Sequence, residues 1–153
     1  RFLQVQAVVD VVLSVPFLLM ARDAASFGRF TELAGLSLWV VALAGESIAD
    51  AQLSRFKRDP SNTGRVCRTG FWSVSRHPNY FFEWLLWCSF ALMATNAPWG
   101  WVSWSAPAMM LYFLVRVTGI PLTEQQAVAS KGDAYRAYQR EVSAFIPWFP
   151  ATR

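Results

Sequence analysis

The sequence predicts an all-α membrane protein: a polytopic transmembrane helical bundle with about four spans and a carboxy-terminal amphipathic helix. Hydrophobic residues make up 54% of the 153 residues and charged residues 16%, whereas average soluble domains are roughly 45–50% apolar and about 25% charged. The apolar residues fall in long runs, each long enough to cross a bilayer as a helix. The chain also has 8 tryptophans, a residue type enriched where helices meet the membrane surface.

The first two apolar runs are predicted spans. The first covers Phe2 to Met20, and the second covers Thr31 to Leu53 after a short polar turn from Arg22 to Arg29. Each run is close to the roughly 20 residues that a membrane-crossing helix needs. No charged leader precedes the first run, so we expect no signal peptide. We interpret residues 1–153 as a single membrane-embedded domain that forms the carboxy-terminal part of a longer protein.

A basic loop is predicted at residues 54–78, between the second and third spans. Its acidic side chain is Asp59, whereas its basic side chains are Arg55, Lys57, Arg58, Arg65, Arg68 and Arg76. Basic residues beside a span mark the cytoplasmic side and attract anionic lipids, and they can also bind phosphate groups. The charge pattern therefore predicts an integral membrane protein with this loop and the carboxy terminus in the cytoplasm.

The third and fourth predicted spans follow the loop. Pro78 can open a helix as its first residue, because the N–H that proline lacks is not needed there. The third span is expected from Asn79 to Thr95, a tight turn from Asn96 to Pro98, and the fourth span from Trp99 to Val117.

Residues 123–150 are predicted to form an amphipathic surface helix and a tail. Tyr135, Tyr138 and Val142 recur at a spacing of three to four residues, which is typical of a helix with one apolar stripe. Gly132 is expected to break the segment in two. The tail from Phe145 to Pro150 is rich in aromatic residues and proline.

Ionisable side chains gather at the predicted cytoplasmic ends of the spans, where they can line one cavity. Ionisable groups in such positions are functional candidates. Glu46 and Asp50 share one helical face, as do Asn79 and Glu83. The candidates named by this argument are Glu46, Asp50, Arg76, His77, Asn79, Glu83, Arg116 and Glu124.

The mixture of side chains favours a nucleotide ligand. Arginine and lysine bind phosphates, carboxylates and Asn suit hydroxyl and amide groups, and Trp72 and Tyr80 can stack on a flat ring. No Gly-x-Gly-x-x-Gly element is present, so a Rossmann site is excluded. Structural alternatives stay open for each group: His77 as a cap, the carboxylates as buried partners of cations, and the aromatic residues as membrane anchors.

Two cysteines, Cys67 and Cys88, are present. One lies in the predicted loop and the other in a predicted span, so we expect no disulfide. Two thiols are too few for a typical structural metal site. We expect no metal and no nucleic-acid partner.

The segment Ser75-Arg76-His77-Pro78-Asn79-Tyr80 resembles the membrane reductases of the steroid 5α-reductase and sterol C14-reductase superfamily. Isoprenylcysteine carboxyl methyltransferases share a related Arg-His-Pro segment. Tyr135-x-x-Tyr138 followed by Ser143-Ala144-Phe145-Ile146-Pro147 is similar to the carboxy-terminal signature of the same superfamily. The likeness covers residues 1–150 and is strongest to a mostly bacterial, uncharacterised branch related to steroid 5α-reductases.

The resemblance implies a cofactor site near the basic loop. It implies that Lys57 and Arg65 contact the phosphates of the cofactor. It also implies that Asn79 and Glu83 lie near the nicotinamide, with Glu83 nearest the reacting centre. The other implied cofactor-binding residues are Glu46, Asp50, Arg76, His77, Tyr80, Arg116, Glu124, Tyr135 and Tyr138.

This sequence departs from the steroid 5α-reductase pattern at three positions. Glu46 stands where those enzymes have Asn, and Ile120 and Glu124 replace a His and a Tyr. The changes bear on the choice between NADPH and NADH. Glu124 is also reminiscent of the methyltransferase branch, whose cofactor is S-adenosylmethionine.

The resemblance implies an NAD(P)H-dependent membrane reductase that acts on a conjugated C=C bond of a lipid or steroid-like substrate. Two alternatives stay open: an S-adenosylmethionine-dependent methyltransferase, and a non-enzymatic protein that binds membrane lipids. The substrate-binding groups are expected largely outside residues 1–153. The sequence predicts neither the oligomeric state nor the lipid.

Overall fold

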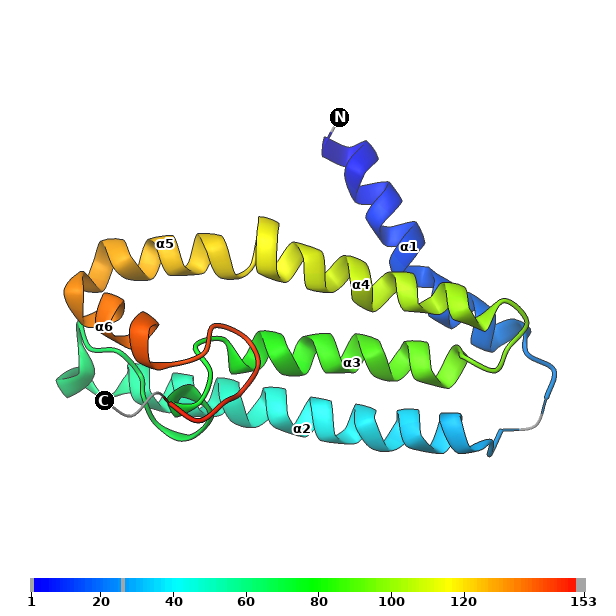
Figure 1. The fold of residues 1–153 in the computed structure, drawn as a ribbon, viewed down its shortest axis with the longest axis horizontal. Helices are drawn as coiled ribbons and strands as arrows, with labels where there is room; N and C mark the ends of the chain where they lie inside the picture. The colour runs from blue at the N-terminus through cyan, green and yellow to red at the C-terminus, as the bar shows by residue number, and fades with distance from the viewer. Residues whose placement is uncertain (1, 26, 151–153) are drawn as a thin grey trace. The chain divides into compact units, whose positions relative to one another are not determined.

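The structure is a computed structural model that describes residues 2–25 and 27–150, and its regular elements there are helices (Figure 1). This confirms the predicted all-α fold. The α-helices are α1 (Phe2–Arg22), α2 (Phe30–Arg58), α3 (Pro78–Ala94), α4 (Ser105–Tyr112), α5 (Ile120–Lys131) and α6 (Asp133–Glu141). The shorter elements are the 3-10 turns η1 (Pro60–Asn62), η2 (Gly70–Ser73) and η3 (Gly100–Trp104) and the π-helical turn η4 (Phe113–Val117).

Within residues 2–25 and 27–150, three helical segments are long and apolar enough to cross a membrane, by length and composition. They are Leu3–Arg22, Phe30–Arg58 and the continuous stretch Gly100–Lys131. These segments correspond to the first, second and fourth predicted spans and indicate an integral membrane protein. The third predicted span lies in α3, which has 17 residues. A total of four spans therefore stays a prediction.

The chain divides into two compact units. The first unit contains Arg1–Ala42 and Trp84–Leu111, and the second contains Leu43–Glu83 and Tyr112–Arg153. Helices α2 and α3 each contribute residues to both units.

In the first unit, α1 packs against η3, and aromatic rings fill the contact between α1 and α3. The ring centroid of Phe17 lies 4.7 Å from that of Phe90 and 6.3 Å from that of Trp87. Gly35 of α2 is required by a close approach, because a Cβ atom there would lie 2.5 Å from Cγ of Met93. Glycine at a helix contact allows this short separation.

The turn between α1 and α2 is fixed by an ion-pair cluster, which we call the Arg29 cluster. The Arg29 guanidinium donates to Asp23 and to Glu32, with 2.6 Å between Nη2 and Oε1 of Glu32. It also donates to the carbonyl oxygen of Asn96, and the Asn96 amide donates to Thr31. The hydrogen bond from Arg29 lowers the pKa of Asp23. The cluster ties two turns of the first unit together.

In the second unit, η2 and its neighbours are held against the last turns of α2. The Trp72 indole N–H donates to the carbonyl oxygen of Ala49 at 2.9 Å, and the Phe71 N–H donates to Gln52 at 2.9 Å. Gly45 faces the ring of Phe82, which leaves no room for a Cβ atom. The predicted loop is therefore an ordered part of the second unit.

Two helix boundaries differ from the predicted ones, and a third agrees. Helix α2 continues to Arg58, so residues 54–58 of the predicted loop are helical. The helix stops before Asp59, because helical backbone is disfavoured at a residue that precedes proline, here Pro60. The Asp59 side chain instead caps η1 by accepting from the backbone N–H of Ser61. Helix α5 begins at Ile120 rather than at Thr123. The predicted break at Gly132 is present, with φ of 55°.

Candidate cofactor-binding site

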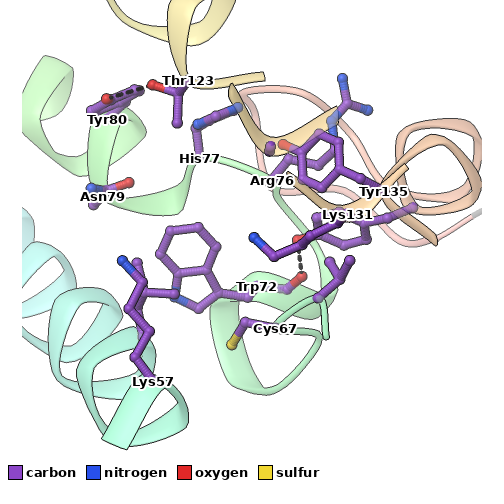
Figure 2. Close-up of a pocket in the computed structure, with 14 residues that line it drawn as sticks. Lys57, Cys67, Trp72, Arg76, His77, Asn79, Tyr80, Thr123, Lys131 and Tyr135 are labelled. Atoms are coloured by element: carbon purple, nitrogen blue, oxygen red, sulfur yellow. Dashed lines mark hydrogen bonds between the residues drawn. The ribbon is translucent and has the colours of Figure 1, made fainter. Parts of the chain in front are cut away.

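The second unit contains a cavity of about 250 Å³ at the start of α3 (Figure 2). Side chains from the end of α2, the segment before α3, the first turn of α3, and helices α5 and α6 form its wall. We call it the α3 cavity. Its lining residues are Leu53, Lys57, Val66, Cys67, Trp72, Arg76, His77, Asn79, Tyr80, Thr123, Ala127, Lys131, Tyr135 and Tyr138.

Stacked rings form one wall of the α3 cavity. The rings of His77 and Tyr80 are almost parallel, with centroids 5.3 Å apart and an interplanar angle of 5°. The Tyr80 hydroxyl lies 3.1 Å from the hydroxyl of Thr123 on α5, and Figure 2 shows this contact. The wall is therefore flat, aromatic and bonded to a second helix, as a planar ligand ring requires.

The Glu124 carboxylate lies behind this wall and joins three polar side chains. Its Oε1 atom accepts from Nε of Arg76 at 2.6 Å and lies 3.3 Å from Nε2 of His77. Its Oε2 atom accepts from the Gln139 amide at 2.9 Å. Both oxygens are thus engaged, and the carboxylate orients the guanidinium and imidazole groups that line the cavity. We call these four residues the Glu124 cluster.

Arg76 also holds the end of α6. Its Nη1 donates to the carbonyl oxygens of Gln139 at 2.8 Å and Val142 at 2.6 Å. Its backbone N–H donates to the carbonyl oxygen of Ser143 at 2.8 Å. Carbonyls at a helix end lack partners inside the helix, so Arg76 caps α6. Arg76 was predicted to bind a cofactor, and these bonds assign it a structural task as well.

The basic side chains at the α3 cavity are the two lysines of the chain, Lys57 and Lys131, together with Arg76. Both lysines also line a neighbouring cavity of about 180 Å³, where Arg65 contributes to the wall. Lys57 and Lys131 stand on α2 and α5, respectively. Ammonium groups on two helices that share both cavities can hold phosphate oxygens.

Asn79 carries the unusual polar atom of this region. Its Oδ1 atom is buried and has no hydrogen-bond partner among the described residues. A buried acceptor without a donor costs about 1–3 kcal/mol, and such atoms in native proteins call for an explanation. Because Asn79 lines the α3 cavity, a ligand N–H group placed there would satisfy this atom.

Two buried tyrosines close the α6 side of the α3 cavity. Burial, together with the nearby charge of Glu124, raises the pKa of Tyr135 to about 12. Burial also raises the pKa of Tyr138, whose hydroxyl donates to the carbonyl oxygens of Trp72 and Ser75. The guanidinium of Arg68 lies 5.1 Å from the centre of the Tyr138 ring. Both phenols are therefore neutral at physiological pH.

The predicted site residues fall into two groups. The α3 cavity brings together Lys57, Arg76, His77, Asn79, Tyr80, Tyr135 and Tyr138, with Glu124 directly behind them. Arg65 lines the neighbouring cavity, and Glu46, Asp50, Glu83 and Arg116 line neither. Glu83 lies within electrostatic range of Glu46 and Asp50. Arg116 is exposed in η4. Cofactor binding by all of these residues stays a prediction.

Sequence reasoning did not assign Thr123, Ala127, Lys131 or Cys67 to the site. The first three are spaced four residues apart and lie on one face of α5, in register with Tyr135 beyond Gly132. This spacing is a signal that could have identified them. Cys67 is buried beside Thr69 and has no such signal.

The helices and the α3 cavity define a helical integral membrane protein with a pocket lined by aromatic, apolar and charged side chains. A family model described as "Protein of unknown function (DUF1295)" matches residues 1–142. The chain belongs to this family, which is related to steroid reductase-like enzymes.

A curated relative is an uncharacterised protein of Schizosaccharomyces pombe. It is 36% identical over 94 residues, which cover 61% of this chain and 27% of the relative. The chain thus matches about a quarter of that protein's length. No solved structure matches the chain.

Proposed function

We propose that the chain is the cofactor-binding part of an integral membrane oxidoreductase. In this proposal the enzyme reduces a conjugated C=C bond of a lipid or steroid-like substrate, and NADPH or NADH donates the hydride. The observation that carries the proposal is the buried, unpartnered Oδ1 atom of Asn79, a residue that lines a cavity together with aromatic and lysine side chains. Relation of the family to steroid reductase-like enzymes supports the same reaction class.

The residues of the α3 cavity fit the nicotinamide end of such a cofactor. The Asn79 oxygen would accept from a carboxamide N–H group, and the stacked rings of His77 and Tyr80 would face a flat ring. A volume of about 250 Å³ lies below the roughly 300–1,000 Å³ typical of ligand pockets. The cavity therefore suits one half of a dinucleotide, with the phosphates between Lys57 and Lys131.

The protein's task in this reaction is to bind and orient. A bound reduced nicotinamide would supply a hydride to the β-carbon of the conjugated system. Asn79 would fix the ring through its amide, and the Glu124 cluster would keep His77 and Arg76 in place. Glu83 lies one helical turn after Asn79 on α3 and would stand nearest the reacting centre. Donors that polarise the substrate carbonyl contribute strongly to such reactions and are proposed outside this chain.

The proposed location is a bacterial inner membrane, with residues 54–78 and the carboxy terminus facing the cytoplasm. The basic side chains around the loop support this orientation, because positive residues favour the cytoplasmic side. A cytoplasmic opening would give the α3 cavity direct access to soluble nucleotides.

Thermal unfolding of the purified full-length protein tests the proposal. NADPH, NADH and S-adenosylmethionine are each titrated in lipid nanodiscs. We expect NADPH or NADH to stabilise the protein, by about 2.7 kcal/mol at 100 times its dissociation constant. Lys57→Ala should weaken this effect, whereas Arg22→Ala removes an exposed charge from the first unit and should leave it unchanged.

The two alternatives give different results in the same titration. Stabilisation by S-adenosylmethionine alone would identify a methyltransferase and refute the reductase. A response to none of the three ligands would favour a lipid-binding protein without enzymatic activity. Glu124 is the residue that suggested the methyltransferase, and protein donors already engage both of its oxygens, which weighs against a direct contact from Glu124 to S-adenosylmethionine.

A further inference from the structure

We propose that residues 143–149, the carboxy-terminal strap, form a membrane anchor that lies in the headgroup–acyl boundary of the lipid leaflet. The strap follows α6 and is distinct from the α3 cavity. The proposal concerns its outer surface and does not depend on which cofactor the cavity binds.

The strap presents a run of exposed apolar side chains. Ile146 is 57% exposed, Trp148 69% and Phe149 86%. Single exposed apolar residues are normal on protein surfaces, but contiguous ones mark interaction sites. Three large apolar side chains within four residues therefore indicate that this surface contacts lipid or another protein.

The strap is held in place along its inner side. The carbonyl oxygen of Phe145 accepts from the Ser75 hydroxyl at 2.8 Å, and the Trp148 N–H donates to the carbonyl oxygen of Val74 at 2.9 Å. The Phe145 ring packs against Phe81 with centroids 5.7 Å apart. Figure 1 shows the strap, in red, folded back beside the segment that precedes α3. Because these contacts fix the backbone, the outward-facing aromatic side chains form a defined surface.

The strap backbone is suited to a poorly hydrated environment. Unsatisfied N–H and C=O groups are costly in lipid. Pro147 has no N–H group, Trp148 already donates its own, and the carbonyls of Ser143 and Phe145 already accept. These features reduce, for four residues of the strap, the number of polar groups that lose a water partner when the strap moves from water to the membrane boundary.

The place of the strap in the second unit favours lipid over protein as its covering. Its partner segment contains Val74 and Ser75, directly after η2, and η2 is bonded to the last turns of the candidate span α2. The strap thus lies at the level where a span ends, which is where Trp side chains are enriched. The exposed Arg140 precedes the strap and complements anionic headgroups.

Depth-dependent fluorescence quenching tests this proposal. The variant Phe149→Cys is labelled with an environment-sensitive maleimide dye in the full-length protein, reconstituted in phosphatidylcholine–phosphatidylglycerol vesicles. The native Cys67 and Cys88 are buried, so the unsubstituted protein reports background labelling. The matched control is Ser61→Cys, at an exposed position of η1.

The Phe149→Cys dye should be quenched roughly twofold more by lipids brominated near the headgroup than by lipids brominated deep in the chains, because boundary segments lie about 5–10 Å deep. It should be shielded from aqueous iodide, whereas the Ser61→Cys dye should be quenched by iodide. Quenching of the Phe149→Cys dye by iodide would refute the anchor. Protection from both quenchers would place a protein surface over the strap and would also refute it.

Discussion

The Arg29 cluster and the Glu124 cluster contain the same kinds of group but differ in whether the polar atoms around them are all paired. In each, an arginine binds carboxylate and backbone carbonyl oxygens and ties together segments far apart in the sequence. Around Arg29, every side chain in the cluster finds a partner. At the α3 cavity, which Arg76 and His77 of the Glu124 cluster line, the chain instead leaves Asn79 with a buried unpaired oxygen. The first cluster stabilises a turn, whereas the cavity beside the second holds an unpaired acceptor that our proposal assigns to a ligand.

The largest expected effect is on stability in the Glu124 cluster. Glu124→Ala leaves the guanidinium of Arg76, whose side chain is 10% exposed, without its carboxylate. Removing one partner of a buried pair costs about 3–5 kcal/mol, and we expect a loss of about 3 kcal/mol in unfolding free energy. Chemical unfolding in nanodiscs measures it. A loss below about 1 kcal/mol would show that the cluster is not a structural centre.

The next effect depends on pH and involves Tyr135. Its pKa is about 12 in the folded protein and about 10 in an unfolded chain. Above pH 10 the unfolded chain loses the proton first, so stability should fall as pH rises from 10 to 12, by about 2–3 kcal/mol at 1.36 kcal/mol per pKa unit. Tyr135→Phe should remove this part of the pH dependence. An unchanged profile would show that the phenol is not buried.

A smaller effect separates ligand binding from stability. Asn79→Ala removes an unpaired acceptor, so the ligand-free protein should unfold at the same temperature or higher. The affinity for NADPH or NADH should fall roughly tenfold, equivalent to about 1.4 kcal/mol for one hydrogen bond. Isothermal titration measures the affinity.

Asn96→Ala is the matched control for this change. The Asn96 amide donates to Thr31 in the first unit, so its loss should lower stability and leave affinity unchanged. An equal loss of affinity in both variants would contradict the separation of the two clusters.

The smallest effect concerns an exposed ion pair. Glu141→Ala breaks the ion pair with Arg68, in which Nη1 of Arg68 lies 2.5 Å from Oε2 of Glu141. The side chain of Arg68 is 42% exposed and that of Glu141 is 45% exposed. Exposed pairs contribute about 0–1 kcal/mol, so unfolding should change by less than 1 kcal/mol. A loss as large as that of Glu124→Ala would show that charge pairing alone, irrespective of burial, stabilises α6.

Local patterns in the sequence predicted much of the fold. Apolar runs located α1, α2 and the helical stretch that begins at Gly100, and the break at Gly132 followed from the preference of glycine for positive φ. The end of α2 was placed at Leu53 because the residues after it are polar. The helix continues to Arg58, since polar side chains do not end a helix and Pro60 does.

The candidate site was predictable as a region but not as a set of contacts. Lys57, His77, Asn79 and Tyr80 were named from the sequence and do line one cavity. The capping of α6 by Arg76 was not foreseen, because its acceptors lie 63 and 66 residues away. Contacts at such separations depend on tertiary packing, which residue spacing does not encode.

The π-helical turn η4 influences the direction in which the chain enters α5, which follows it after a bend at Thr118 and Gly119. Its wider turn takes one more residue than an α-helical turn, and each residue of an α-helix advances by about 100°. The N–H groups of Thr118 and Gly119 both point to the carbonyl oxygen of Phe113. The helix before η4 is apolar, yet Thr123, Ala127 and Lys131 after it face the α3 cavity. A residue gained or lost in η4 would therefore change the direction in which the chain enters α5 and shift Lys131 relative to the cavity.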